Sequence, residues 1–429
     1  MNTLFVKNGW LPDIGLVNVA VTNGLITAIG AVLSPPTDGS PCLDAAGMLL
    51  APGLVNGHTH AAMTLFRGFG DDMPLMEWLR QRIWPAEARL SEEDVYWGTK
   101  LACLEMIRSG TCCFQDMYWH YNGVVRAVTE MGLRAGVGAV LIDVAGVEQA
   151  VACKKLAEQM FEESHDYPDR LRYTLAPHAI YTVSEETLRW IADFSDRHDL
   201  PVHIHLSETR HEVEQCLQQH GMRPAYYLDR LGLLTSRMLL AHGVYLDDGE
   251  LDLIGQRGAT LVTNPVSNLK LAVGAVFPYQ KASDRGIPIA IGTDGAASNN
   301  SLDLFQEVKT LALIQKHAMN DPTTLPAAAA WEIVTGSRAP LATTQAAVTH
   351  RATLAVGQPA DFLLLRHQEI EVSPNHQLLS NLVYAASGHI VDSVVVNGRV
   401  LMHQRRIDGA EEIRLEACAR AALLSRSVQ

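Results

Sequence analysis

Short apolar runs rich in β-branched residues mark the N-terminal part of the chain. Leu4–Val6, Leu16–Val21 and Leu25–Ile29 have the composition of strands. Two dipeptides separate them, Asn8-Gly9 and Asn23-Gly24, and Asn-Gly is a strong short-range signal for a tight turn between strands. The pattern therefore predicts a small antiparallel sheet in this part of the chain.

The C-terminal part of the chain repeats this pattern. Asp361–Leu365 and Ser393–Val396 are predicted strands, and Asn397-Gly398 marks a hairpin directly after the second one. Two β-rich ends that enclose a long middle section indicate one unit built from both ends. We predict a discontinuous β-sandwich domain made of residues 1–55 and 350–429.

The middle of the chain alternates apolar runs with helical patterns. Eight runs resemble buried parallel strands: 49–55, 111–114, 133–142, 171–176, 201–206, 238–241, 259–263 and 287–291. Helical periodicity is clearest over residues 92–107, 185–197, 210–220 and 301–316. Ser91, with Asp94 three residues later, forms a capping-box-like start to the first of these helices. This alternation predicts an α/β fold with a TIM-like (β/α)8 barrel over residues 56–349.

Composition and charge narrow the function classes. With 429 residues, 48% of them hydrophobic, the chain can bury a full-size core. A net charge of −13 argues against nucleic acid as a partner. No apolar stretch approaches the roughly 18 residues that span a membrane, so no membrane contact is expected. The seven cysteines show no C-x-x-C spacing and Met1–Trp10 lacks the layout of a signal peptide, which together predict reduced thiols and a cytoplasmic location.

Polar side chains follow almost every predicted barrel strand. In chain order they are His58 and His60, Gln115 and Asp116, Asp143, His178, His203, His205 and Glu208, His242, Asn264, and Asp294. The carboxyl ends of the strands form the active-site face of a (β/α)8 barrel. We therefore expect these groups to converge on one mouth.

The spacing of the histidines favours a metal site. His58 and His60 are two residues apart, so on a strand both imidazoles point to the same face and suit one metal ion. The alternative is two unrelated polar residues in a loop. His203 and His205 have the same spacing, which by itself leaves open which of them is the third ligand. We favour His205, with His203 as a core histidine hydrogen-bonded deeper in the barrel.

Three further residues are candidates for proton transfer. Glu208 is a general acid or base candidate, or else a first-turn carboxylate favoured by the helix dipole. His242 closes an apolar strand and is expected to face the site, although a lone histidine is often structural. Asp294 can ligate a metal and accept a proton from water, or simply belong to an Asp-Gly turn. Three histidines and one aspartate suit one zinc ion, with iron possible.

A second metal ion is not expected. A binuclear site would need a bridging ligand, typically a lysine near the end of the fourth strand. The sequence there is Ala176-Pro177-His178. The site is therefore predicted to be mononuclear.

The motifs Pro52–His60, His205–Glu208, His242 and Thr293-Asp294 resemble those of the amidohydrolase superfamily, and the resemblance covers essentially the whole chain. Within it, the chain is similar to the methylthioadenosine/S-adenosylhomocysteine deaminase family. The residues that carry this closer likeness are 63–68, 75–79, 83–87, 264–271 and 292–300. The resemblance implies a zinc-dependent hydrolase that deaminates 5′-methylthioadenosine, S-adenosylhomocysteine or adenosine to the inosine analogue and ammonia.

The resemblance also implies roles for single residues. His58, His60, His205 and Asp294 would hold one Zn2+ per subunit, with Fe2+ as the alternative. Glu208, His242 and Asp294 would be catalytic: Asp294 takes the proton of the attacking water, His242 orients that water, and Glu208 protonates ring nitrogen N1. Glu87 would bind the ribose hydroxyls and His178 the nucleoside, with Glu208 and Asp294 also touching substrate.

One departure from the family pattern bears on the substrate. Some members carry arginines after the third strand that meet an amino-acid tail, but residues 137–146 contain none. A carboxylate is matched best by a guanidinium. The sequence therefore favours methylthioadenosine or adenosine over adenosylhomocysteine.

Other readings remain open from the sequence. The same scaffold could deaminate guanine, an aminotriazine or aminodeoxyfutalosine, and a protein of another class, a non-catalytic scaffold, could share the fold. The stretch Leu75–Pro85 is rich in Trp and Leu and predicts an apolar flap, a partner-facing surface or simple helix packing. A homo-oligomer is possible, and nothing in the sequence determines its size.

Overall fold

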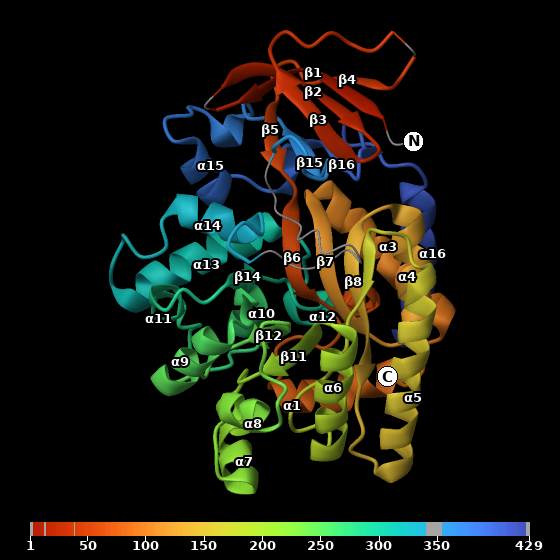
Figure 1. Cartoon of the computed structure of the whole chain (residues 1–429), viewed down its shortest axis with the longest axis vertical. Coiled ribbons are helices and arrows are strands. Elements are labelled where there is room, and N and C mark those ends of the chain that lie inside the picture. Colours follow the sequence, from red (N-terminus) through yellow and green to blue (C-terminus); the bar gives the residue numbers. More distant parts are fainter. Residues whose placement is uncertain (1–2, 13, 38, 340–353, 426–429) are drawn as a thin grey trace.

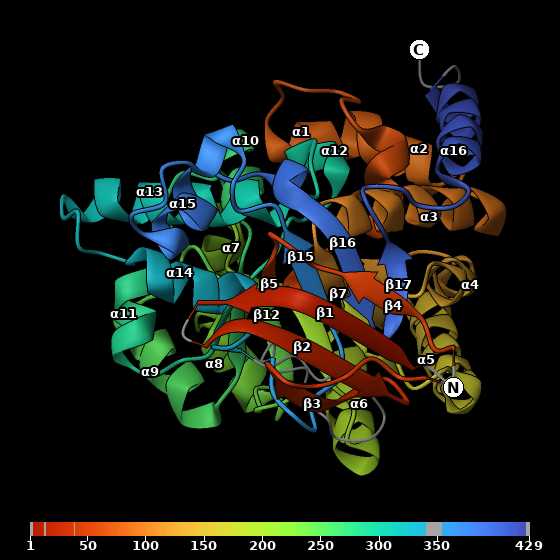
Figure 2. The same ribbon diagram turned by 90° about the horizontal axis from the view of Figure 1, so that it is seen from above.

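The computed structural model describes residues 3–12, 14–37, 39–339 and 354–425. A ring of parallel strands forms the centre of the molecule, and a second sheet made from both ends of the chain lies over one end of it (Figure 1). Seen from above, this second sheet spreads across that end of the ring (Figure 2).

The central strands run parallel in two ladders. They are β6 (Leu54–Thr59), β7 (Thr111–Tyr118), β8 (Arg134–Leu141), β9 (Leu171–Tyr173), β10 (Ala176–Pro177), β11 (Val202–Leu206), β12 (Met238–His242), β13 (Thr260–Thr263) and β14 (Ile289–Ile291). The first ladder joins β6 to β10 and the second joins β11 to β14. The eight predicted strand positions are all present, the fourth being shared by β9 and β10.

The two ladders meet at both joints without a continuous run of strand hydrogen bonds. At one joint, isolated bridges pair Leu175 with Val202 and Ala179 with His205. At the other, the N–H groups of Thr293 and Asp294 donate to the carbonyl of His58, each at 3.1 Å. The predicted α/β, TIM-like arrangement is confirmed, although the ladder does not close into an unbroken ring.

Helices surround the strands and bury their apolar faces against them. They are α1 (Leu75–Trp78), α2 (Trp84–Glu87), α3 (Glu92–Arg108), α4 (Tyr121–Met131), α5 (Val147–Glu163), α6 (Glu185–His198), α7 (Arg210–His220), α8 (Pro224–Arg230), α9 (Asp248–Arg257), α10 (Pro265–Lys270), α11 (Tyr279–Asp284), α12 (Ala296–Asn299), α13 (Leu304–Met319), α14 (Ala327–Val334), α15 (Leu378–Tyr384) and α16 (Ala410–Ser425). The capping box of Ser91 and Asp94 starts α3 as predicted. Helix α13 begins later than the predicted residue 301, because Asp303 is its N-cap and accepts the N–H of Phe305. Among the described residues, no helix combines the length and apolar character needed to cross a bilayer.

The terminal strands form one eight-stranded sheet. They are β1 (Leu4–Leu11), β2 (Gly15–Thr22), β3 (Leu25–Gly30), β4 (Cys42–Asp44), β5 (Leu49–Pro52), β15 (Phe362–Leu365), β16 (Val391–Val396) and β17 (Arg399–Met402). Strand β15 pairs with β5, which joins the two ends of the chain in one sheet. The sheet has an apolar core of its own, in which Val6, Val19, Leu50 and Phe362 are buried. The predicted domain boundary at residues 349–350 lies outside the described residues, and the division of the chain into domains stays a prediction.

Two local predictions need correction. Asn8-Gly9 is not a turn: it lies inside β1 as a bulge, with Asn8 at φ 62° and the register with β2 shifted between Val6 and Gly9. The predicted strand 49–55 is two strands in different sheets, β5 and β6, which divide at Gly53. A Cβ at Gly53 would lie 2.3 Å from the Cys112 sulfur, so the close approach of β7 explains the glycine at this junction.

Candidate active site

Four side chains from three strand ends meet at the mouth of the barrel. His58 and His60 come from the end of β6, His205 from β11 and Asp294 from the segment after β14, and their ligand atoms all lie within 4.8 Å of one another. The His58 Nε2 atom is 3.2 Å from His205 Nε2 and 3.3 Å from Asp294 Oδ1, and His60 Nε2 is 3.2 Å from Asp294 Oδ1. Zinc ligands ~2.0–2.1 Å from the ion would be about 3.3 Å apart in a tetrahedron. These donor atoms therefore fit one metal ion.

The opposite ring nitrogen of each histidine is held by a hydrogen bond. His60 Nδ1 lies 2.6 Å from the Met117 carbonyl oxygen, and His205 Nδ1 lies 2.8 Å from that of His178. A carbonyl can only accept, so both Nδ1 atoms carry a proton, which leaves both Nε2 atoms to serve as metal ligands. His58 Nδ1 lies 2.8 Å from His203 Nε2. His203 is thus behind His58, where the sequence analysis placed a core histidine, and outside the group of four.

The two carboxylate oxygens of Asp294 have different neighbours. Its Oδ2 accepts from the hydroxyls of Ser267 at 2.7 Å and Ser298 at 2.9 Å, whereas Oδ1 faces His58 and His60. Burial alone would raise the pKa of Asp294, but its bonds to the two histidines hold it well below its ordinary value. The carboxylate is therefore ionised and aimed at the centre of the group.

Glu208 stands beside this group on a turn that Glu212 holds. Glu212 accepts the backbone N–H groups of Ser207 at 2.8 Å and Glu208 at 2.9 Å, one on each carboxyl oxygen. Ser207 has φ 50°, a left-handed conformation that is costly for a non-glycine residue. Burial raises the pKa of the Glu208 side chain, so this carboxyl keeps a proton more readily than an exposed one.

His242 closes β12 and also takes a left-handed conformation, at φ 73°. Its Nδ1 atom lies 2.9 Å from the Asn268 side-chain oxygen and 3.9 Å from Glu208 Oε1. The ring therefore faces the site with a fixed orientation. Asn268 comes from α10, in the loop region after β13.

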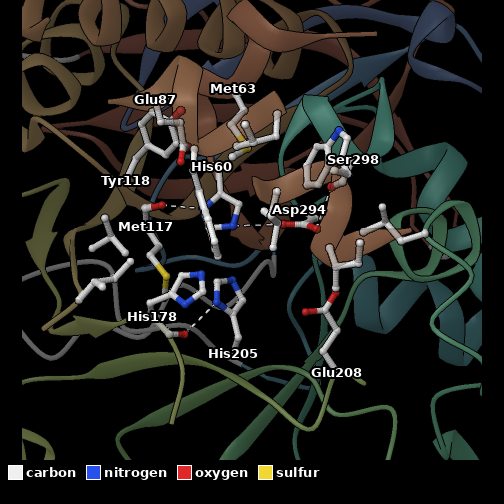
Figure 3. A pocket seen from close by; sticks show the side chains of 18 of the residues that line it. His60, Met63, Glu87, Met117, Tyr118, His178, His205, Glu208, Asp294 and Ser298 are labelled. Atoms are coloured by element: carbon white, nitrogen blue, oxygen red, sulfur yellow. Dashed lines mark hydrogen bonds and ion pairs between the residues drawn. The ribbon is translucent and has the colours of Figure 1, made fainter. Parts of the chain in front are cut away.

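His60, His205, Glu208, His242 and Asp294 line one pocket, shown from close by in Figure 3, whereas His58 is buried and does not line it. Glu87 and Glu208 lie on opposite sides of His60 and His205 in this view. Burial raises the pKa of Glu87, against the opposing effect of Tyr118 and Trp119. His178 also lines the pocket, and burial lowers its pKa to about 3, so its imidazole is neutral.

The predicted apolar stretch Leu75–Pro85 forms a wall of this pocket. It comprises α1, a π-helical segment Leu79–Ile83 and the start of α2. The side chains that it contributes to the lining are those of Leu75, Trp78, Leu79, Ile83 and Trp84. Of the three alternatives for this stretch, the geometry favours a wall beside the site.

The pocket lining omits six of the polar strand-end residues, namely His58, Gln115, Asp116, Asp143, His203 and Asn264. Three of these support neighbouring segments. Asp143 turns to Ser184, whose N–H and hydroxyl it accepts at 2.6 Å each, and so supports the start of α6. Asp116 accepts the N–H of Ala61 at 2.7 Å and so holds the segment after His60. Asn264 lies 3.3 Å from His242 Nδ1 and acts from behind that ring.

Several residues that shape the site were not found from the sequence. They are Glu212, Ser267, Asn268, Ser298 and Glu307. Glu307 accepts the Val266 N–H at 3.1 Å and also bonds Asn299, which places both serines that hold Asp294. Glu212 lies four residues after Glu208, in the first turn of α7. Acidic residues are common in the first turn of a helix, so the sequence gives little indication of its role in the site.

The comparisons with known proteins agree with this geometry. The model of the amidohydrolase family matches residues 49–401 of the chain. This chain belongs to the amidohydrolase family. A 5′-deoxyadenosine deaminase of Methanoregula boonei is 46% identical to it over 388 residues, which cover 90% of this chain and 87% of that protein.

Two further proteins are similar to this chain over most of its length. A 5-methylthioadenosine/S-adenosylhomocysteine deaminase of Syntrophobacter fumaroxidans is 43% identical over 396 residues, which cover 91% of this chain and 89% of that protein. The solved structure of an adenosine deaminase from Xanthomonas campestris with bound zinc has a TM-score of 0.91 and 34% identity, and covers 99% of this chain and 98% of that one. The family resemblance and the prediction of a hydrolase are thereby confirmed.

Proposed function

We propose that this amidohydrolase is a zinc-dependent deaminase of adenine nucleosides. The observation that carries the proposal is a single pocket in which a buried carboxyl, Glu208, stands beside four convergent metal-binding side chains. The similar proteins support it, since their names describe deaminases of 5′-deoxyadenosine, of methylthioadenosine or adenosylhomocysteine, and of adenosine.

The donor set supports zinc as the metal. Imidazole nitrogens with one carboxylate oxygen suit zinc, and iron(II) is the closest alternative. His58, His60, His205 and Asp294 would hold one ion per subunit. A bound zinc ion supplies a water whose pKa is lowered toward neutrality, which makes it a nucleophile at physiological pH.

The protein's own groups divide the proton transfers. Asp294, ionised and held by Ser267 and Ser298 through its other oxygen, accepts the proton of the attacking water. It then passes this proton to the 6-amino group, which leaves as ammonia when the C6–N bond breaks. Glu208 delivers a proton to ring nitrogen N1 as C6 is attacked, and its raised pKa suits a carboxyl that must arrive protonated. His242, oriented by Asn268, holds the water in line with C6.

The rest of the pocket suits a nucleoside. Glu87, across the site from Glu208, can accept hydrogen bonds from the two ribose hydroxyls (Figure 3). His178 lines the pocket as a neutral imidazole, able to donate or accept a hydrogen bond with the substrate. The aromatic and aliphatic side chains of the Leu75–Pro85 wall exclude water from the base.

Ammonia release tests the proposal. Zinc-loaded protein is assayed with 5′-deoxyadenosine, methylthioadenosine, adenosylhomocysteine, adenosine, adenine, guanine and an aminotriazine, beside a chelated control. We expect chelator-sensitive turnover of the 6-aminopurine nucleosides and no turnover of the free bases. Activity only on a free base or triazine would remove the ribose role of Glu87 and overturn the nucleoside assignment.

A further inference from the structure

Helices α3, α7 and α9 each carry an acidic residue at their third position. In α3 and α9 this residue completes a capping box: Asp94 accepts the N–H of the N-cap residue Ser91 at 2.9 Å, and Glu250 accepts that of Asp247 at 3.1 Å. The bond stabilises the start of the helix to which the acidic residue belongs. These two helices show the ordinary use of an acidic residue at this position.

Glu212 in α7 departs from this pattern. Its N-cap is Thr209, whose hydroxyl accepts the Glu212 N–H at 3.2 Å. The Glu212 carboxylate bonds past the N-cap instead, and accepts the N–H groups of Ser207 at 2.8 Å and Glu208 at 2.9 Å, one on each oxygen. Both N–H groups lie before the helix, in the turn that follows β11. The carboxylate therefore stabilises the turn that carries Glu208 and not the first residue of its own helix.

This turn needs such support. Ser207 has φ 50°, a left-handed conformation that is unfavourable for a residue with a side chain. The Ser207 hydroxyl is buried and has no hydrogen-bond partner among the described residues, whereas its carbonyl accepts the Tyr245 N–H at 2.9 Å. The Glu208 carboxyl lies in the pocket (Figure 3), 3.9 Å from His242 Nδ1. The place of this carboxyl therefore depends on the backbone of the turn, and Glu212 supplies two of the bonds that fix that backbone.

We infer that Glu212 is a positioning residue of the deaminase, which holds the Glu208 carboxyl where it can protonate N1 of the base. This inference rests on the proposed function. Glu212 is buried and does not line the candidate active-site pocket, so it acts on the substrate only through the turn of Glu208. A displacement of about 1 Å in a reacting group can lower a rate about 10²-fold, and two hydrogen bonds to adjacent N–H groups resist such a displacement.

A double-substitution cycle tests this role. The values of kcat and KM for 5′-deoxyadenosine are measured for the zinc-loaded wild type, Glu212→Gln, Glu208→Gln and the double variant. Glutamine has the size of glutamate but only one acceptor oxygen, and its NH2 group would face the second backbone N–H, so the turn must shift. We expect Glu212→Gln to lower kcat about 10- to 100-fold. KM should change by less than about threefold, and the zinc content should stay the same.

The comparison of the two backgrounds separates positioning from a structural role. Once Glu208 has lost its proton, its exact position matters little, so the double variant should stay within about twofold of Glu208→Gln alone. An equal loss in both backgrounds would show that Glu212 supports the whole site or the fold, and would overturn the inference.

Glu250→Gln is the matched control. Glu250 is as deeply buried as Glu212, and its two oxygens also accept backbone N–H groups, from Ala225 at 3.0 Å and Asp247 at 3.1 Å. It does not line the pocket. Denaturant titration should show a loss of stability for both variants, whereas kcat of Glu250→Gln should stay within about twofold of the wild type. A similar fall in kcat for Glu250→Gln would show that loss of any such carboxylate lowers activity, which contradicts a specific role for Glu212.

Glu212→Asp provides a second variant. Its carboxylate keeps the charge, but the side chain is one methylene shorter and cannot bond both N–H groups unless α7 moves. Its kcat should therefore also fall, and again only while Glu208 is present. Burial raises the pKa of Glu212 to about 7, so the assays are run at pH 8, where the wild-type carboxylate is mostly ionised.

The outcomes distinguish this inference from the proposed function. Deamination by the wild type together with an unchanged kcat in Glu212→Gln overturns the positioning role and leaves the deaminase standing. Near-normal turnover in Glu208→Gln removes the acid that Glu212 would position, and with it the inference. Failure of the wild type to deaminate any adenine nucleoside removes both proposals.

Discussion

The two ends of the barrel both bury charged groups, and they balance them in opposite ways. Where the strands begin, the guanidinium of Arg134 bonds Asp361, and Asp361 also accepts the Asn397 N–H at 2.6 Å. This set is complete within the chain and ties the barrel to the terminal sheet. Where the strands end, the metal-binding atoms of His58, His60, His205 and Asp294 lie within 4.8 Å of one another. That set is arranged to take up a cation from solution.

The backbone conformation also differs between the two ends of the barrel. Before the strands, positive φ values fall mostly on glycines, such as Gly110 before β7 and Gly132 before β8, where they cost little; Asp199 before β11 is an exception. After the strands they fall on Ser207, His242 and Asp294, where each costs roughly 1–3 kcal/mol. These three residues belong to the candidate site, which agrees with the general rule that the carboxyl ends of barrel strands carry the chemistry.

The largest effect, a fall in kcat, is expected when the proposed proton donor at the carboxyl ends of the strands is removed. Glu208→Gln keeps the size and hydrogen bonding of the side chain but cannot transfer the proton. We expect kcat to fall about 10²- to 10⁴-fold with zinc content and thermal stability unchanged, measured by ammonia release and metal analysis. Near-normal turnover in a zinc-replete variant would exclude Glu208 as the acid.

A substitution at the opposite end of the barrel should change the free energy of unfolding and leave kcat unchanged. Arg134→Met leaves the Asp361 carboxylate buried without its ion pair, so the free energy of unfolding should fall by about 3–5 kcal/mol. Denaturant titration measures it, and kcat of the folded fraction should match the wild type. The double variant Arg134→Met/Asp361→Leu should recover much of the loss; an undiminished loss would show that packing, rather than the orphaned charge, is responsible.

A smaller effect, on metal affinity, is expected from His203, which bonds His58 of the metal-binding group. His203→Leu removes the ring nitrogen that bonds His58 Nδ1, and loss of such a partner typically lowers metal affinity about 10- to 100-fold. Zinc competition with a chromogenic chelator measures it. His203→Gln, which offers an oxygen near the same position, should keep most of the affinity, and equal behaviour of the two variants would contradict the orienting role.

The last effect concerns the pH dependence of stability and is at most ~1.4 kcal/mol for each pH unit. Burial raises the pKa of Glu307 to about 8, so the folded protein keeps a proton that the unfolded chain loses above its ordinary pKa. The folded state then binds more protons, and the free energy of unfolding falls as pH rises between those two values, by at most ~1.4 kcal/mol per pH unit for this group. Denaturant titrations of chelated protein from pH 5 to 8 should show a shallower slope for Glu307→Gln, and an unchanged slope would contradict the raised pKa.

The sequence determined the order of elements and the positions of the metal-binding candidates. Apolar runs bounded by turn residues indicate buried parallel strands, and the polar residue after each run indicates the active end of a barrel. His58, His60 and Asp294 were singled out in this way, since a two-residue spacing or a strand end is a local property. The same spacing left His203 and His205 undecided, and the structure places His205 in the group of four. The capping box at Ser91 was found for the same reason, because it spans a single turn of helix.

Only the tertiary structure decided what surrounds those residues. Glu212, Ser267 and Ser298 act through bonds that depend on how loops of different strands pack, and nothing in their local sequence distinguishes them from helix caps. Asn8-Gly9 became a bulge because β1 continues past it to pair with other strands. Trp78 and Trp84 line the pocket because the fold brings the segment from α1 to α2 beside the strand ends. Local patterns report the intrinsic preference of a short segment, whereas contacts between distant segments arise only when the chain has folded.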